Sequence, residues 1–378
     1  MTSYNYTKVL SMDFYKNEFL EVSKANRDKK VIFYGAGEVF DIMNNIFELK
    51  NYFNIEGISD KKFENKTDRF YNDYKIIKPS ELQKSDAEVI LLTLAYPDKV
   101  MEFLSGQNLN KEIKPFYKKI DPILKYDVEL IKKDNKKYYY HLNSYNVNLV
   151  SDDYNGIIEE VFFWQIYNIK NKFGFQEYSL YDIGMNRAYT DIYFALDDRC
   201  KKTFGFEPFK GTFNFAKENV SLNPKYANKI NLFNFGLSNK NSQNDVYYLP
   251  HRDGISTVNI DFIKNYAPEE INNLKKETVN LKQASKVFKE LFLNDNSKQK
   301  ILKLDAEGAE YEVIPDLFES GMLKQFNIIA GDMHILNEKS ETMELFDYMY
   351  KSGFKTYEMH QHQKTIDYVM YKEIEILE

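Results

Sequence analysis

The sequence predicts an α/β protein in which a Rossmann-like sheet, ending in an antiparallel hairpin, follows a smaller Rossmann-like α/β domain. Three observations support this prediction. A strand pattern leads through a glycine turn into a helix pattern at two places, residues 30–49 and 179–196. Apolar runs of strand length alternate with helix patterns, which favours parallel sheets covered by helices. Two strand patterns then follow each other directly at 355–359 and 366–371, as in a hairpin.

The first predicted domain covers residues 1–119. Its glycine turn, Gly35-Ala36-Gly37, is followed by Asp60, about where a dinucleotide fold places the acid that binds ribose, ~20 residues after the turn. The third glycine of that motif is replaced by Phe40. One interpretation is an NAD-dependent sugar-nucleotide enzyme, and another is a turn that only packs. A third, intermediate interpretation is a module that helps to hold a nucleotide-sugar or builds a dimer. The elements expected here are strands at 30–34, 53–58, 87–94 and 113–116, a helix at 38–49 and a short helix from residue 79.

Residues 120–178 are predicted to connect the two domains. Strand patterns at 138–142 and 147–150 indicate a hairpin, and a helix that is apolar over most of its surface follows Ser151. Trp164 belongs to this helix. We expect Trp164 in the core rather than at a ligand, because large aromatic side chains are mostly buried.

The third predicted domain, residues 179–378, opens with half of a nucleotide-binding βαβ unit. A strand at 180–183 ends in Gly184, which lets the backbone turn sharply and approach a ligand. A helix at 189–196 directs its free N–H groups toward the same place. The next strand, at 203–206, is followed by Glu207, at the position where such folds bind ribose hydroxyls.

The rest of this domain completes a sheet with acidic residues at its carboxyl edge. Ligands of open α/β sheets bind beyond the carboxyl ends of the strands, so we expect the site there. The acids that follow or end these strands are Asp182, Glu207, Asp305 and Asp332. The remaining elements expected are helices at 212–222, 310–318 and 341–351, and strands at 230–236, 246–249, 256–260, 301–304 and 326–330, with a turn at 250–254 and a segment at 277–281 that leads into another short element.

Composition excludes several classes of protein. The net charge of −6 gives no basic surface for nucleic acid, and no apolar run approaches the ~18 residues of a membrane span. Cys200 is the only cysteine, which excludes disulfides and a cysteine-based zinc site. We find no signal-peptide pattern at the N-terminus. These observations predict a cytoplasmic protein, and they leave a homodimer open.

Three motifs carry a resemblance to a known family. DIGMN at 182–186, GFEP at 205–208 and ILKLDAEGAEYEVI at 301–314 resemble the FkbM family of S-adenosylmethionine-dependent O-methyltransferases, over roughly residues 149–378. The resemblance implies a class I methyltransferase fold and methyl transfer to a hydroxyl. It also implies a sugar acceptor, which we expect to be nucleotide-activated or glycan-linked and destined for a bacterial surface or capsular polysaccharide.

One departure from the family motif raises a further alternative. Where the family commonly has a second turn glycine, this chain has Arg187-Ala188. Ala188 is strained if that position needs a positive φ. The departure motivates a third interpretation, a non-catalytic protein that keeps the S-adenosylmethionine fold.

The resemblance also implies residues for the cofactor. Asp182, Gly184 and Asn186 are expected to shape the methionine pocket, and Glu207 is expected to bind the ribose diol. The complete set expected to bind S-adenosylmethionine is Asp182, Gly184, Asn186, Thr190, Glu207, Pro208 and Ser238.

Asp305, Asp332 and His334 are the predicted catalytic residues. Two candidates compete to activate the acceptor hydroxyl. His334 as a neutral imidazole suits a general base. Alternatively, Asp305 and Asp332, with His334 or Glu307, would hold Mg²⁺ or Mn²⁺, which prefer oxygen ligands. Lys303 alternates inward on a buried strand, so we expect a carboxylate partner for it.

Overall fold

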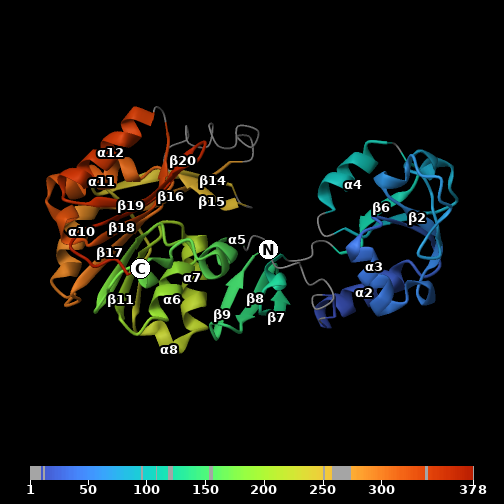
Figure 1. Ribbon diagram of the computed structural model, residues 1–378, viewed down its shortest axis with the longest axis horizontal. Coiled ribbons are helices and arrows are strands. Elements are labelled where there is room, and N and C mark those ends of the chain that lie inside the picture. Colours follow the sequence, from blue (N-terminus) through green and yellow to red (C-terminus); the bar gives the residue numbers. More distant parts are fainter. Residues whose placement is uncertain are drawn as a thin grey trace. The chain divides into compact units, whose positions relative to one another are not determined.

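The computed structural model describes residues 10–11, 13–94, 97–107, 109–117, 122–152, 156–249, 252–257, 274–336 and 339–377 (Figure 1). The chain forms two compact units, Met1–Lys132 and Lys133–Glu378, and the division falls inside strand β7 (Val128–Asp134). Within the described ranges, every helix is too short or too polar to cross a membrane.

The first unit contains a four-stranded parallel sheet in the order β2-β1-β5-β6. Its central strands β1 and β5 are almost fully buried and apolar because both faces are covered, and Ile32, Ile90 and Leu92 lie in its core. Its further elements are a small hairpin and a 3₁₀ turn at Pro79–Lys84. The helices and strands are α2 (Asp13–Ala25), β1 (Lys30–Tyr34), α3 (Glu38–Phe47), β2 (Asn54–Ser59), β3 (Phe70–Tyr71), β4 (Tyr74–Lys75), β5 (Val89–Leu92), α4 (Asp98–Ser105) and β6 (Glu112–Pro115).

The glycine turn of the first unit is held by Asp60. Oδ2 of Asp60 accepts a hydrogen bond from the N–H of Ala36 at 2.8 Å, and Oδ1 accepts one from the N–H of Lys62 at 2.9 Å. Gly35 has φ 113° and lies against Leu94, where a Cβ would fall 2.7 Å from a Leu94 methyl carbon. Both carboxylate oxygens of Asp60 therefore accept hydrogen bonds from backbone N–H groups. This geometry favours a structural role for the glycine turn over ribose binding by Asp60.

The second unit is built on a seven-stranded sheet in the order β12-β11-β10-β17-β18-β20-β19. All neighbours are parallel except β20, which runs antiparallel to both β18 and β19. This is the class I methyltransferase arrangement, as predicted. The strands are β10 (Tyr178–Ile183), β11 (Cys200–Phe206), β12 (Ile230–Phe233), β17 (Gln299–Leu304), β18 (Ile328–His334), β19 (Lys355–Gln361) and β20 (Thr365–Tyr371).

Helices cover both faces of this sheet (Figure 1). The larger core joins sheet residues such as Tyr181 and Leu302 to Phe288, Val313 and Phe346. On the other face, Met185 and Ala188 pack with Ala216. The helices are α6 (Tyr189–Ala195), α7 (Lys210–Ser221), α8 (Pro224–Ala227), α10 (Ala284–Phe292), α11 (Glu310–Glu319) and α12 (Lys339–Lys351).

A second, smaller sheet is inserted between β12 and β17. Its order is β13-β16-β14-β15, with β13 (Gly236–Ser238), β14 (Ser242–Leu249), β15 (Arg252–Thr257) and β16 (Lys275–Gln283). The strand predicted at 230–236 is therefore two strands in different sheets. The hairpin predicted around 250–254 is present as β14 and β15, although residues 250–251 and 258–260 lie outside the described residues.

The hairpin predicted before the catalytic sheet is confirmed as β8 (Lys137–Leu142) and β9 (Val147–Ser151). The helix predicted after it is not a regular one. A single α-turn, α5 (Gly156–Ile158), continues into a π-helical turn, Glu159–Trp164, that ends at Gln165 with φ 55°. The expected core position of Trp164 is wrong, because its side chain is 59% exposed.

Strand β18 is longer than predicted. The sequence predicts a strand at 326–330 followed by a loop, but β18 runs to His334. The reason is its partner: β20 pairs with β18 along its whole length, with Asp332 opposite Asp367 and His334 opposite Thr365. Asp332 and His334 therefore lie on a hydrogen-bonded strand.

Candidate active site

A cavity of ≈300 Å³ lies at the carboxyl edge of the seven-stranded sheet. That volume is at the lower end of the range for small-molecule sites. Its walls come from the turn after β10, the end of β11, the loop after β17 and the end of β18. Most residues predicted for the site line it, namely Gly184, Asn186, Thr190, Glu207, Pro208, Asp305, Asp332 and His334.

The turn after β10 shapes one wall of this cavity. Gly184 has φ 78°, and a Cβ there would fall 1.9 Å from the carbonyl oxygen of Asp305, so only glycine allows the two strand ends to meet. Asn186 and Ala188 also have positive φ, 53° and 62°. The Oδ1 atom of Asn186 is buried and has no hydrogen-bond partner among the described residues. A ligand amino group would satisfy that acceptor.

Asp182 does not line the cavity, contrary to the sequence prediction. It is fully buried, and its Oδ1 lies 3.0 Å from Nζ of Lys303. Lys303 also donates to the carbonyl oxygen of Gly184 at 2.8 Å. Burial opposes the charge on Lys303, but Asp182 and Asp305 more than offset that effect and raise its pKa. The predicted carboxylate partner of Lys303 is confirmed. Because Lys303 contacts both Asp182 and the carbonyl oxygen of Gly184, the pair stabilises the turn after β10.

Ser238 also lies outside the cavity. It belongs to β13, and its hydroxyl donates to Glu312 of α11. Glu207, in contrast, is at the predicted place at the end of β11. Its buried carboxylate lines the cavity and accepts the N–H of Phe209 at 2.9 Å. That contact fixes the orientation of the Glu207 side chain.

The Arg187-Ala188 pair leaves the cavity open. The Arg187 side chain is buried away from it: Nη2 lies 2.7 Å from Asp152, Nη1 donates to Ser151, and the guanidinium lies 4.5 Å from the centre of the Phe215 ring. Ala188 does adopt the left-handed conformation that the sequence analysis identified as strained. Replacing the family's glycine by Arg187-Ala188 therefore strains the backbone at Ala188, but neither side chain occupies the cavity.

A network of acids surrounds His334. Its Nδ1 lies 3.1 Å from Oε1 of Glu310 and its Nε2 lies 3.3 Å from Oε2 of Glu307. Glu310 is fully buried and also accepts the N–H groups of Ala306 and Gly308. Burial opposes protonation of His334, but Glu307 and Glu310 outweigh it and raise its pKa well above the usual value. This raised pKa favours the charged imidazole over the neutral one that the sequence predicts.

Asp332 has the properties of a general base that His334 lacks. Burial raises its pKa, and Asp305 and Asp367 add to this effect against the opposing charge of His334, so that the pKa reaches about 7. Its buried Oδ1 has no hydrogen-bond partner among the residues described. A base is most effective when its pKa is near the working pH.

The residues predicted to hold a metal are Asp305 and Asp332, with His334 or Glu307. One ligand atom each from Asp305, Glu307 and His334 lie within 4.8 Å of one another, whereas Asp332 is not part of this group. Carboxylate and imidazole donors suit a divalent cation. Glu310, on the second ring nitrogen of His334, is the kind of outer contact that orients a metal-bound histidine. The donor set fits a metal through Glu307 rather than through Asp332.

Sequence reasoning missed two residues that complete the cavity. The Tyr167 hydroxyl donates to Oδ2 of Asp305 at 3.0 Å, and Glu160 lies beside them. Burial raises the pKa of Glu160 to about 7, with contributions from Asp305 and Glu159. An acid inside an otherwise apolar helix pattern was the available signal for Glu160. Nothing in the sequence distinguishes Tyr167, which follows the π-helical turn in an irregular segment.

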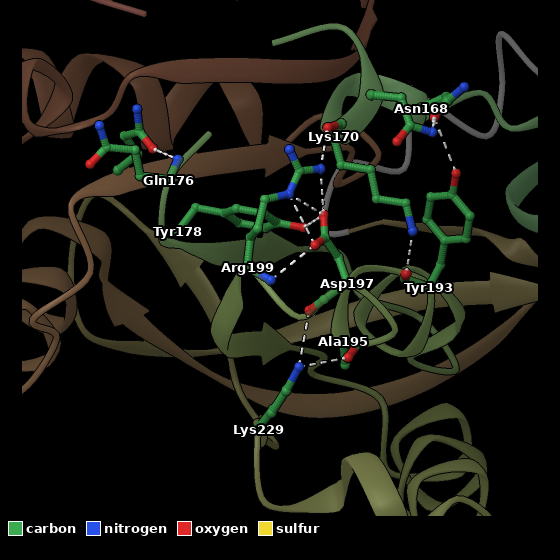
Figure 2. Close-up of polar contacts among 11 residues, drawn as sticks. Asn168, Lys170, Gln176, Tyr178, Tyr193, Ala195, Asp197, Arg199 and Lys229 are labelled. Carbon is green, nitrogen blue, oxygen red and sulfur yellow. Dashed lines mark hydrogen bonds and ion pairs between the residues drawn. The ribbon is translucent and has the colours of Figure 1, made fainter. Parts of the chain in front are cut away.

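A separate polar cluster holds the segment that follows Tyr167 (Figure 2). The buried ammonium of Lys170 donates to the Tyr193 carbonyl at 2.8 Å, and Arg199 donates to the Lys170 carbonyl at 2.7 Å. Asp197 pairs with Arg199 at 2.7 Å and accepts from Tyr178. These contacts tie the segment to α6 and to the starts of β10 and β11, and thereby position Tyr167 and the π-helical turn before it.

Comparison with known proteins identifies the domain. Residues 182–369 match the family described as the methyltransferase FkbM domain. No curated protein matches the chain.

Solved structures resemble the chain only distantly. Methyltransferase FkbM from Methylobacillus flagellatus KT is 9% identical with a TM-score of 0.36, covering 96% of this chain and all of that one. The Methanococcus jannaschii fibrillarin pre-rRNA processing protein is 10% identical with a TM-score of 0.33, covering 65% and 98%. Precorrin-6y C5,15-methyltransferase from Geobacter metallireducens GS-15 is 10% identical with a TM-score of 0.30, covering 55% and 86%. TM-scores this low are no evidence for the fold, which is defined by the strand order of the seven-stranded sheet.

Proposed function

Because residues 182–369 belong to the FkbM methyltransferase domain family, we propose that this enzyme transfers a methyl group from S-adenosylmethionine to a sugar hydroxyl. The observation that carries the proposal is the single cavity in which Gly184, Asn186 and Glu207 meet Asp305 and Asp332. The first three would hold the cofactor, and the last two lie where an acceptor has to react. We assign the activity to the second unit, Lys133–Glu378.

The residues present fit the cofactor. The buried, unpartnered Oδ1 of Asn186 suits the amino group of the methionine part, and the carboxylate of Glu207 suits two ribose hydroxyls. When bound, S-adenosylmethionine supplies a methyl group made electrophilic by its sulfonium. The acids around the cavity favour that positive charge.

In the reaction, Asp332 accepts the hydroxyl proton as the acceptor oxygen bonds to the methyl carbon. The methyl group would come from the bound cofactor, whose carbon–sulfur bond would break with the electron pair left on sulfur, giving the methyl ether and S-adenosylhomocysteine. Tyr167 and Lys303 keep Asp305 in place through contacts of 3.0 and 3.8 Å. Holding both reactants in line contributes about 7–11 kcal/mol to such a step, and the base adds roughly 10²- to 10⁴-fold.

We also propose that Asp305, Glu307 and His334 would hold Mg²⁺ or Mn²⁺. A bound cation would make the acceptor hydroxyl more acidic. The test is a Mn²⁺ titration followed by thermal unfolding. The unfolding temperature of the wild-type protein should rise, and that of the Glu307→Gln variant should not. Equal responses of the two proteins would remove the metal from the proposal.

Calorimetry and mass spectrometry test the transfer itself. S-adenosylmethionine should bind with measurable heat, and incubation with a panel of nucleotide-sugars and glycans should give products heavier by one methyl group. Cofactor binding without any methylated product would favour the non-catalytic interpretation. Quenching of NADH fluorescence by the protein, with no response to S-adenosylhomocysteine, would favour the dinucleotide enzyme.

A cytoplasmic site of action fits the single, buried cysteine, Cys200.

A further inference from the structure

A second cavity of ≈490 Å³ adjoins the first. Glu160, Ile166, Tyr167, Asp305 and Asp332 line both. The second cavity extends over β18, β20 and β19, on the side away from the turn after β10 and from Glu207. A molecule in it would reach Asp332 without occupying the place proposed for the cofactor.

Trp164 lines this second cavity, and its side chain is 59% exposed. A single exposed aromatic residue is ordinary on a protein surface. Trp164 differs because it lines a cavity and ends a π-helical turn, a rare element that is frequent at functional sites. In a turn with i→i+5 hydrogen bonds, residues four apart lie on one side, and Glu160 and Trp164 line the same cavity. The turn therefore presents a flat apolar ring beside a carboxylate.

The other lining groups are mainly hydrogen-bond acceptors. Asp305, Asp332, Glu358 and Asp367 add four carboxyl groups to that of Glu160, and the basic side chain among the lining residues is His360. Glu358 pairs with Lys172 and Asp367 pairs with His362, each at 2.7 Å. The lining itself has five acids and one histidine, and this composition disfavours phosphate. It accepts hydrogen bonds from hydroxyl groups, and the C–H face of a sugar ring suits the electron-rich face of an indole.

We infer that the Trp164 cavity is the acceptor subsite and that it binds an uncharged sugar ring, with any phosphate of the acceptor left outside. The inference rests on the proposed methyl transfer, since it gives the second cavity to the molecule that is methylated. It limits the acceptor to molecules with an uncharged sugar ring. The ring stacks on Trp164, the carboxyl groups accept hydrogen bonds from its hydroxyls, and one hydroxyl reaches Asp332.

The sequence offers a direct probe of this subsite. Trp164 is the only tryptophan of the chain, so the tryptophan emission reports on this position alone. The protein with bound S-adenosylhomocysteine is titrated with methyl glucoside, methyl mannoside, methyl rhamnoside and, separately, choline. A saturable change in emission with at least one glycoside, and none with choline, is expected. A response to choline alone would show that the acidic aromatic site selects cations and would overturn the inference.

Variants give the second measurement. Trp164→Ala should raise the KM of the acceptor found by mass spectrometry about tenfold, and Trp164→Phe should restore most of it, since aromatic contacts are worth up to about one power of ten. Tyr350→Ala removes an exposed aromatic that lines neither cavity and should change nothing. S-adenosylhomocysteine should bind all variants equally.

The outcomes separate the two proposals. If S-adenosylhomocysteine fails to bind the wild-type protein, the methyl-transfer proposal is wrong. If it binds, but no glycoside changes the emission and Trp164→Ala keeps the wild-type KM, only the subsite inference is wrong.

Discussion

The Nδ1 atom of His334 lies 3.1 Å from a carboxylate oxygen of Glu310, and both side chains are buried. Glu310 also accepts two backbone N–H groups of the loop after β17, so one carboxylate orders both the loop and the imidazole. This relationship raises the pKa of His334 and fixes the orientation of its ring, and a cation bound at Nε2 would take the place of the proton there.

Removing that carboxylate should be costly. In Glu310→Gln, the charged His334 loses its closest partner, and breaking a buried pair costs about 3 kcal/mol. Urea unfolding should show this loss of free energy. The matched control is Glu177→Gln, which breaks an exposed pair with Lys201 and should leave the unfolding midpoint unchanged. A Glu310→Gln variant as stable as the control would contradict the importance of the pair.

Replacing Asp332 tests the base. Asp332→Asn should lower turnover about 10²- to 10⁴-fold while the affinity for S-adenosylmethionine stays close to that of the wild type. The wild-type rate should rise with pH through about 7, where Asp332 loses its proton. Steady-state kinetics and calorimetry measure the two quantities separately. Full turnover in Asp332→Asn would exclude the assigned role.

Glu207 and Ser238 give a matched pair for cofactor binding. Glu207 lines the cavity and Ser238 does not, although the sequence pointed to both. Glu207→Gln should weaken S-adenosylmethionine binding about tenfold or more, because hydrogen bonds to a charged group are worth about 1.5–3 kcal/mol. Ser238→Ala should leave the dissociation constant unchanged by calorimetry. The reverse order of effects would mean that the cofactor lies elsewhere.

Two substitutions in the turn after β10 should act in opposite directions. Gly184→Ala places a Cβ 1.9 Å from the Asp305 carbonyl and should lower the free energy of unfolding by at least about 2 kcal/mol. Ala188→Gly relieves a left-handed alanine and should raise it by about 0.5–1 kcal/mol. Denaturant titration of both variants measures this. Destabilisation by Ala188→Gly would show that its methyl packing outweighs the strain.

Glu160 should make stability depend on pH. Its pKa is about 7 in the folded protein against 4.5 for an exposed carboxyl, so the folded state holds the extra proton between these values. The free energy of unfolding therefore falls as pH rises from about 4.5 to about 7. Glu160→Gln should flatten this part of the profile, measured as urea midpoints at a series of pH values. If the stability of Glu160→Gln depends on pH as steeply as that of the wild type, the Glu160 carboxyl is exposed to water and does not have a raised pKa.

The sequence was most informative where local pattern and packing agree. The strand, glycine turn and helix around Gly184 and the acid at Glu207 were predictable because each depends on a few neighbouring residues. The alternation of strands and helices was enough to predict the parallel sheet and its closing hairpin.

Prediction failed where a distant partner decides the structure. β18 extends to His334 only because β20 pairs with it, and the charge state of His334 depends on Glu310 and Glu307. Ser238 looked equivalent to the other predicted residues because no local pattern reveals that Glu312 engages its hydroxyl. Trp164 was assigned to the core because a periodic pattern cannot show that a helix changes into a π-helical turn.

The pairing of β18 with β20 keeps Asp332 on a rigid ladder, whereas Glu160 and Trp164 come from one irregular turn. Substitutions in that turn can change the wall of the cavity while Asp332, the proposed base, keeps its position. Relatives with the same chemistry can therefore diverge in the molecules they modify by varying a stretch of about six residues. For protein engineering, this turn is the place to begin when changing the acceptor of the enzyme.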